Sequence, residues 1–324
     1  MIRFTDRPEY CPREWYDECL QELSQHLGSL AGIRSVYRFG NISIPGISDL
    51  DILLVFENET SCIASGLEQL SAKHKILFTH GIMAMSEQHF LLNDYYTIWS
   101  DRTLLAGKHP EGAALERTEA DDKHIKQQIA LEFLAANYVD FAVQQAYGIF
   151  KLRGLLQHTK GLLLDLDFLN IHESPIHEPI QTLREKAQRW FEQPVSDSYL
   201  TGWLQHFIPR YNELCATIFA EHPMYLAGTA PYVIAKNLRL ENGRTLATHR
   251  SGIRLPYLPF INGRKQFKLL NKLNTFDFEL PVINSTPHKI LEDRFQFLRE
   301  MKSHNRRNLP NFMTMTTSIT SKLI

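Results

Sequence analysis

The chain has 324 residues, 44% of them hydrophobic, which is enough to bury a large core and to form two or three domains. It contains no run of about 18 apolar residues that would span a membrane, and its first residues lack a signal-peptide segment, so we expect a cytoplasmic protein with no membrane partner. The four cysteines have no C-x-x-C spacing, which argues against structural zinc and disulfide frameworks.

The net charge of −1 hides an uneven distribution along the chain. Residues 1–230 hold 19 Lys and Arg against 30 Asp and Glu, whereas residues 231–324 hold 16 against 6. A basic C-terminal third is typical of proteins with an anionic partner, such as nucleotide, RNA, a phosphorylated acceptor or an anionic glycan. The alternative is that the basic C-terminal third docks on the acidic part of the same chain or of a second copy.

Three elements are predicted before residue 57. Helical spacing of apolar residues indicates an amphipathic helix over about 9–29. The pattern of apolar and polar residues over 33–39 predicts a strand that ends at Gly40, and residues 49–56 predict a second strand. The second strand is apolar from residue 52 onward, so it is expected to be buried on both faces.

Two acids lie at the start of the second predicted strand, in the segment Pro45-Gly46-Ile47-Ser48-Asp49-Leu50-Asp51. On an extended strand, Asp49 and Asp51 leave the same face, so their carboxylates can share a divalent cation. Mg²⁺ prefers a few carboxylate oxygens together with waters and phosphates, which suits a site that handles nucleotides. The alternative is that the two acids only begin the strand at the protein surface.

The segment from Phe39-Gly40-Asn41 to Phe56 resembles the signature of the DNA polymerase β-like nucleotidyltransferase superfamily, over about residues 30–110. There, Gly-Ser or Gly-Gly is followed by a loop and by Asp-x-Asp on a strand. Here Asn41 replaces the small residue, and the loop is short. The resemblance implies a metal site at Asp49 and Asp51 and a nucleotide site that includes the four residues Arg38, Gly40, Asn41 and Ser48.

The superfamily also supplies a third carboxylate from a later strand. After a predicted helix over about 61–73, the next strand candidate is residues 75–85, which contains no acid. His80 lies near the expected place of that acid; it suits a base better than a Mg²⁺ ligand. The acids that follow are candidates in the order Glu87, Asp101, Asp94, and a solvated surface role is the alternative for each.

Residues 95–99 predict a further strand, and Pro110-Glu111-Gly112 a domain boundary. Thr118 and the acids after it indicate the start of a long helix. A helix over about 149–166 places Arg153 and Lys160 on one face, where cations of this superfamily's helical domain meet the triphosphate; a solvated helix face is the alternative. Two more helices are predicted, over 178–193 and 197–221.

The last third of the chain differs from the rest in its residue pattern. Asn242-Gly243 between short alternating runs predicts a β-hairpin. Cations interleaved with aromatic residues follow over 250–276, a pattern that suits either single-stranded nucleic acid or a core with a charged rim. Residues 302–324 are expected to be mobile.

These patterns together predict an α+β protein. Residues 1–112 form a nucleotidyltransferase-like domain, a small mixed β-sheet with helices on one face; residues 113–228 form a helical domain; and residues 229–324 form a basic region with a hairpin and a mobile tail. The expected activity is metal-dependent transfer of a nucleoside monophosphate from ATP or another nucleoside triphosphate, with Mg²⁺ or Mn²⁺, to a hydroxyl of a small molecule, protein or RNA.

The catalytic residues expected for this reaction are Asp49, Asp51, His80 and Glu87. The alternative function is a catalytically degenerate nucleotidyltransferase fold that binds nucleotide or RNA in a regulatory role.

Overall fold

The computed structural model describes residues 2–62, 67, 70–99, 101–112, 115–227, 232–235, 238–241, 245–248, 279–281, 286 and 288–316. Among these residues the chain divides into two compact units. The sheet unit comprises Pro8–Lys126 and Glu292–Thr316, and the helical unit comprises the residues before Pro8 and Gln127–Leu291. Both helices and strands are present, as the sequence predicts. The three-domain division stays a prediction.

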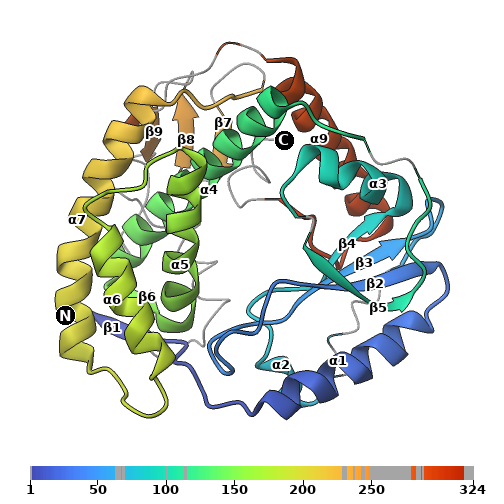
Figure 1. Cartoon of the computed structure of the whole chain (residues 1–324), viewed down its shortest axis with the longest axis horizontal. Coiled ribbons are helices and arrows are strands. Elements are labelled where there is room, and N and C mark those ends of the chain that lie inside the picture. The colour runs from blue at the N-terminus through green and yellow to red at the C-terminus, as the bar shows by residue number, and fades with distance from the viewer. Residues whose placement is uncertain are drawn as a thin grey trace. The chain divides into compact units, whose positions relative to one another are not determined.

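A four-stranded mixed sheet is the centre of the sheet unit (Figure 1). Its spatial order is β4–β3–β2–β5; β3 runs parallel to β4 and antiparallel to β2, which is antiparallel to β5. The apolar run of β3 is buried on both faces, as predicted. The strands are β2 Ile33–Phe39, β3 Asp51–Phe56, β4 Met83–Ser86 and β5 Arg102–Gly107.

Helices cover both faces of this sheet, so the prediction of helices on one face is wrong. The predicted first helix is confirmed as α1 (Arg13–Gly28), whose buried residues recur at helical spacing and pack against Val36 and Leu54. The opposite face, with Leu53, packs against α3 (Glu87–Tyr96) and α9 (Lys289–Asn308). The face alternates along each strand because successive side chains point to opposite sides.

The end of the described chain returns to the same sheet. After α9, the backbone of Met313 accepts from the amide of Ala84 at 3.0 Å and donates to the carbonyl of Ile82 at 2.9 Å. Leu309, Phe312 and Met315 are buried. The prediction of mobility from residue 302 is therefore wrong for residues 302–316, and residues 317–324 lie outside the described part.

Several predicted strands between residues 49 and 107 need correction. β3 begins at Asp51, so Asp49 precedes the strand. The predicted strand over 75–85 is wrong for most of its length, because the short helix α2 (Ala72–Lys75) and a turn come before β4. The predicted strand over 95–99 is wrong: α3 runs to Tyr96, and the strand is β5 instead. Residues 63–66, 68 and 69 of the predicted helix over 61–73 lie outside the described residues, and α2 includes only the last two residues of that range.

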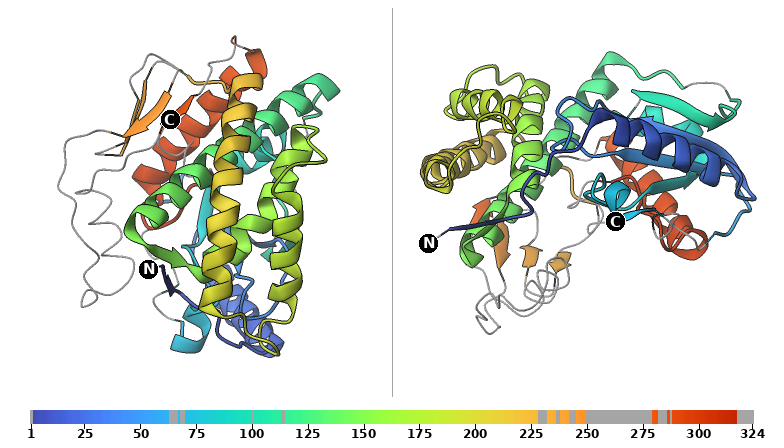
Figure 2. Two further views of the ribbon diagram at one scale, coloured as in Figure 1. Left: turned by 90° about the vertical axis from the view of Figure 1, so that its left-hand side faces the viewer. Right: turned by 90° about the horizontal axis from the view of Figure 1, so that it is seen from below.

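The helical unit confirms the predicted run of helices. Thr118 caps the first turn of α4, since its hydroxyl oxygen accepts from the amide of Asp121 at 3.1 Å. Tyr211 of α7 donates to the carbonyl of Leu134 in α4 at 2.8 Å, so these helices pack closely. Figure 2 shows the helices from two further directions. The elements are β1 Arg3–Thr5, α4 Glu119–Tyr147, β6 Ile149–Lys151, α5 Leu152–Phe168, α6 His177–Gln188 and α7 Asp197–Glu221.

None of the described helices combines the length and the apolar character needed to cross a membrane. The short strand β1 pairs in parallel with β6, with Phe4 opposite Phe150. The start of the predicted helix over 149–166 is thus a strand.

A second four-stranded sheet is antiparallel throughout, in the order β10–β9–β8–β7. Glu241 of β8 lies opposite Thr245 of β9, which confirms the predicted hairpin. Its Asn242-Gly243 turn and the cations and aromatic residues over 250–276 lie outside the described residues. The strands are β7 Tyr232–Ala235, β8 Leu238–Glu241, β9 Thr245–Thr248 and β10 Glu279–Pro281.

Candidate functional site

The candidate site begins at the turn that leaves β2. Gly40 has a φ of 64°, in the left-handed region that favours glycine. A Cβ on this residue would lie 3.9 Å from Oδ2 of Asp51, so the turn faces that carboxylate directly. Phe39 pairs with Asp51 across the antiparallel strands, which places the end of β2 beside the start of β3. The predicted glycine turn therefore borders the predicted acidic pair.

The two aspartates reach one cluster although only Asp51 belongs to the strand. Asp49 follows a turn in which the amides of Ile47 and Ser48 both donate to the carbonyl of Ile44. The amide of Leu50, between the aspartates, donates to the carbonyl of Leu77 at 2.9 Å. These bonds fix the backbone on both sides of Asp49 and direct its side chain toward the segment that leads into β4.

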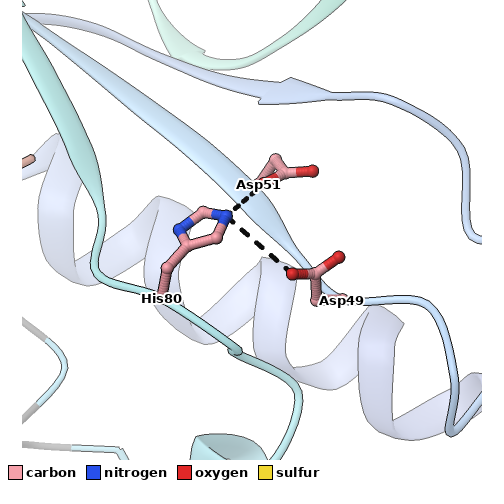
Figure 3. A group of neighbouring side chains, drawn as sticks. All are labelled: Asp49, Asp51 and His80. Atoms are coloured by element: carbon pink, nitrogen blue, oxygen red, sulfur yellow. Dashed lines mark hydrogen bonds and ion pairs between the residues drawn. The ribbon is translucent and has the colours of Figure 1, made fainter. Parts of the chain in front are cut away.

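His80 completes the cluster from the segment that leads into β4. Its Nε2 lies 2.6 Å from Oδ1 of Asp51 and 3.8 Å from Oδ2 of Asp49 (Figure 3). Its Nδ1 donates to the carbonyl of Gly81 at 2.7 Å, which sets the orientation of the ring. Because β4 runs parallel to β3, the segments that lead into the two strands lie at the same end of the sheet.

The charge of His80 depends strongly on this setting. The hydrogen bond to Asp51 raises the pKa of His80 to about 9 against the opposing effect of burial, with smaller contributions from the Gly81 carbonyl and from the charges of both aspartates. At neutral pH the cation-free cluster is therefore an imidazolium between two carboxylates. The side chains are 17%, 35% and 30% exposed for Asp49, Asp51 and His80, so the cluster is open to solvent on one side.

The donor set fits a divalent cation. One ligand atom from each of Asp49, Asp51 and His80 can be chosen so that all three lie within 4.8 Å of one another. Within the described part of the chain, this is the one group of three or more such residues that meets that distance. Three protein ligands leave further coordination positions for water or a substrate oxygen.

The loop before Asp49 is anchored to α1. The buried hydroxyl of Tyr16 donates to the carbonyl of Ser48 at 2.7 Å and accepts from the amide of Gly46 at 2.9 Å. Arg13 donates to the carbonyl of Ile42 at 2.8 Å. The first helix thus holds the loop that carries the acidic pair.

The remaining predicted catalytic acids lie elsewhere. Glu87 begins α3 and pairs with Arg34, whose Nε lies 3.5 Å from its Oε1. Asp94 receives two hydrogen bonds from Arg102, at 2.6 and 2.8 Å. Asp101 is exposed. None of these acids belongs to the described metal-ligating group, whose third member is His80.

The predicted nucleotide-binding residues are placed differently from one another. Asn41 is exposed beside the glycine turn. The hydroxyl oxygen of Ser48 accepts from the amide of Ile44 at 3.0 Å, which is a structural role in the loop. Arg38 lies within β2, opposite Ile52, and its Nε is buried without a hydrogen-bond partner.

The two predicted cations of α5 belong to the helical unit. Arg153 is buried there, whereas Lys160 is exposed. They do not form the single solvated stripe that helical spacing suggested as an alternative. Their part in nucleotide binding stays a prediction.

Sequence reasoning missed two residues that support the cluster. The hydroxyl of Thr79 donates to Oδ2 of Asp49, and Tyr16 anchors the loop. Thr79 lay in a segment predicted as a strand, where neighbouring side chains alternate faces, so it was not expected beside His80. Nothing in the spacing of α1 distinguishes Tyr16 from an ordinary core residue.

Comparison with known proteins adds no relative: no family model, no curated protein and no solved structure matches this chain.

Proposed function

We propose that the chain is a metal-dependent nucleotidyltransferase, which transfers a nucleoside monophosphate from a nucleoside triphosphate to a hydroxyl-bearing acceptor. The observation that carries this proposal is the convergence of Asp49, Asp51 and His80 within 4.8 Å beside a left-handed glycine turn. The turn, the acidic pair and the neighbouring strand end agree with the resemblance to the DNA polymerase β-like superfamily noted in the sequence.

Each residue of the site has a separate role in the proposed reaction. Gly40 permits a phosphate to approach the backbone closely, because no Cβ obstructs the turn. Asp49, Asp51 and His80 would hold the cation, and the hydroxyl of Thr79 orients the carboxylate of Asp49. A bound divalent cation would supply the positive charge that neutralises phosphate oxygens and the departing pyrophosphate.

The chemical step is an in-line displacement. The acceptor oxygen forms a bond to the α-phosphorus, the bond from that phosphorus to the leaving-group oxygen breaks, and the hydroxyl proton passes to solvent. Positioning of the reactants and electrostatic stabilisation supply most of the rate in such chemistry.

The test is a panel of the four ribonucleoside triphosphates, each radiolabelled at the α-phosphate, incubated with the protein, Mg²⁺ or Mn²⁺, and a desalted cell extract as the source of acceptors. We expect one triphosphate to label an acceptor, and the Asp49→Asn/Asp51→Asn variant to reduce labelling by about 10²-fold or more. The matched control is Glu14→Gln/Asp17→Asn, which neutralises two exposed acids of α1.

Labelling at the wild-type rate by Asp49→Asn/Asp51→Asn would contradict the proposal. Failure of the wild-type protein to transfer label from any triphosphate would contradict it as well.

A second candidate function is nucleotide binding without transfer. One observation favours it: the third member of the described cluster is an imidazole, in contact with Asp51 at 2.6 Å, and not a carboxylate. This candidate predicts that nucleotides raise the melting temperature of the protein equally with and without divalent cations, and that no label is transferred. The transferase proposal predicts that nucleotide binding requires a cation.

A further inference from the structure

We propose that His80 makes this site select a first-row transition cation, of the Mn²⁺ to Zn²⁺ series, over Mg²⁺. The inference rests on the cation site of the proposed function and specifies which ion it takes. It depends on the identity and orientation of the third ligand, whereas the proposed transfer depends on the acidic pair.

The orientation of the ring is the first argument. The carbonyl of Gly81 can only accept, so Nδ1 of His80 is the donor in the 2.7 Å bond between them. This bond turns Nε2 toward both carboxylates, 2.6 Å from Asp51 Oδ1 and 3.8 Å from Asp49 Oδ2. Histidine ligands of metals usually donate their other ring N–H to a carbonyl or carboxylate, which fixes the tautomer and the direction of the lone pair. His80 has this arrangement.

The support of the acidic pair is the second argument. The hydroxyl of Thr79, adjacent to His80 in the chain, donates to Asp49 Oδ2, the same oxygen that faces the imidazole. Ligating carboxylates are commonly held by hydrogen bonds of this kind. Two ligands of the cluster are thus positioned by groups outside it, so their convergence is not an accident of a mobile surface.

The chemistry of the donor set is the third argument. Mg²⁺ prefers oxygen ligands in near-ideal octahedral geometry and gives up its waters reluctantly. Imidazole nitrogen suits the transition cations, whose affinity for nitrogen and oxygen sites rises from Mn²⁺ toward Zn²⁺ and Cu²⁺. A site with two carboxylates and one imidazole therefore gains a strong bond with a transition cation and only a weak one with Mg²⁺.

The experiment measures cation affinity without nucleotide. Mn²⁺ binding is followed by electron paramagnetic resonance, and Mg²⁺ binding by its competition with Mn²⁺. We expect the wild-type protein to bind Mn²⁺ at least about tenfold more tightly than Mg²⁺. His80→Asp, which supplies a third carboxylate, is expected to lower this preference about tenfold or more, chiefly by strengthening Mg²⁺. His80→Gln is expected to weaken Mn²⁺, while the control His26→Gln, at the end of α1, leaves both affinities unchanged.

A spectroscopic readout separates ligation from a merely structural role of His80. Co²⁺ bound to the wild-type protein is expected to broaden and shift the NMR signals of the ring nitrogens of one histidine. His80→Gln is expected to lack these shifted signals. Thermal unfolding of each variant reports whether the fold is retained.

The inference fails if Mg²⁺ and Mn²⁺ bind the wild-type protein equally, or if His80→Asp leaves the preference unchanged. Nucleotide transfer with equal rates in Mg²⁺ and Mn²⁺ would contradict the cation preference and support the proposed transferase function. Selective Mn²⁺ binding without transfer from any triphosphate would support the cation preference and contradict the transferase function. Absence of binding by every cation would overturn both.

Discussion

His80 is the residue on which the chemistry of the cluster depends most. It joins two carboxylates from a neighbouring strand end and carries a positive charge at neutral pH in the cation-free protein, because Asp51 raises its pKa to about 9. The same nitrogen that contacts Asp51 is the one that a cation would take. The ion pair and the bound cation are therefore competing states of one site.

This raised pKa predicts how stability depends on pH. Because the pKa of His80 is higher in the folded protein than its ordinary value of 6.5, its contribution is fully present below about pH 6.5 and is lost as pH rises toward about 9. His80→Gln removes that contribution. In the absence of metal, the difference in free energy of unfolding between the wild type and His80→Gln should shrink over this window.

Urea unfolding at pH 6, 8 and 10, with a chelator present, measures that difference. A difference that stays constant across the three pH values would show that His80 is not charged through its contact with Asp51.

The sequence identified Asp49 and Asp51 as a pair because acids two positions apart on an extended strand leave the same face, and a buried apolar run follows them. It identified His80 only as lying near the place of a missing acid. Glu87 was the first candidate for that acid, but α3 carries it to Arg34. Its direction depends on where α3 begins, and the sequence predicted no helix between the strand candidates 75–85 and 95–99.

At the scale of elements, the connection between α1 and the loop before Asp49 is the main support of the site. Tyr16 is fully buried and its hydroxyl bonds to the backbone of both Gly46 and Ser48. The two bonds satisfy an amide and a carbonyl within a turn that has no strand partner there. Tyr16 therefore acts as a positioning residue for the acidic pair.

Tyr16→Phe tests this role. The change keeps the ring in the core but removes the hydroxyl that bonds the Gly46 amide and the Ser48 carbonyl, at a cost of about 1–3 kcal/mol in the free energy of unfolding. We also expect faster amide hydrogen exchange at residues 42–50. Tyr10→Phe, at a side chain that is 67% exposed, is the control.

Exchange that accelerates evenly over the whole sheet unit, with none specific to the loop, would mean that Tyr16 contributes only to the core.

Elements with clear periodicity were predictable, and short or irregular ones were not. α1 and the long helices have buried residues at helical spacing over several turns. The apolar segment 75–85 suggested one strand, yet it holds the last residue of α2, a turn and the first three residues of β4, because a buried apolar run does not distinguish these states. β5 was missed: it has a mixed burial pattern and is held at the edge of the sheet by its pairing with β2.

At the scale of the whole molecule, the sheet unit is built from two distant parts of the sequence. Residues of α9, including the fully buried Met301, pack on the same sheet face as Leu53. Asn305 donates to the carbonyl of Ala84 at 2.6 Å, and Met313 pairs with the backbone around β4. β4, which follows His80, is therefore held from both sides, by β3 and by the C-terminal segment.

This long-range pairing could not be predicted from local patterns. The segment 302–324 was expected to be mobile because of its polar and basic residues, and its few apolar side chains gave no indication of a partner. Leu309 and Phe312 are buried only because the chain returns to a strand about 230 positions earlier, as the register of Met83 with Met313 shows. Local propensity is a weak guide where tertiary contacts decide the outcome.

The most direct measurement of the central claim is the binding of Mn²⁺ to the full chain, followed by electron paramagnetic resonance, before and after the acidic pair is neutralised. The account predicts that the wild type and Glu14→Gln/Asp17→Asn bind Mn²⁺ alike, and that Asp49→Asn/Asp51→Asn, with an unchanged fold by circular dichroism, loses that site. Equal Mn²⁺ binding by all three proteins would contradict it, because the cluster of Asp49, Asp51 and His80 would then not be a cation site.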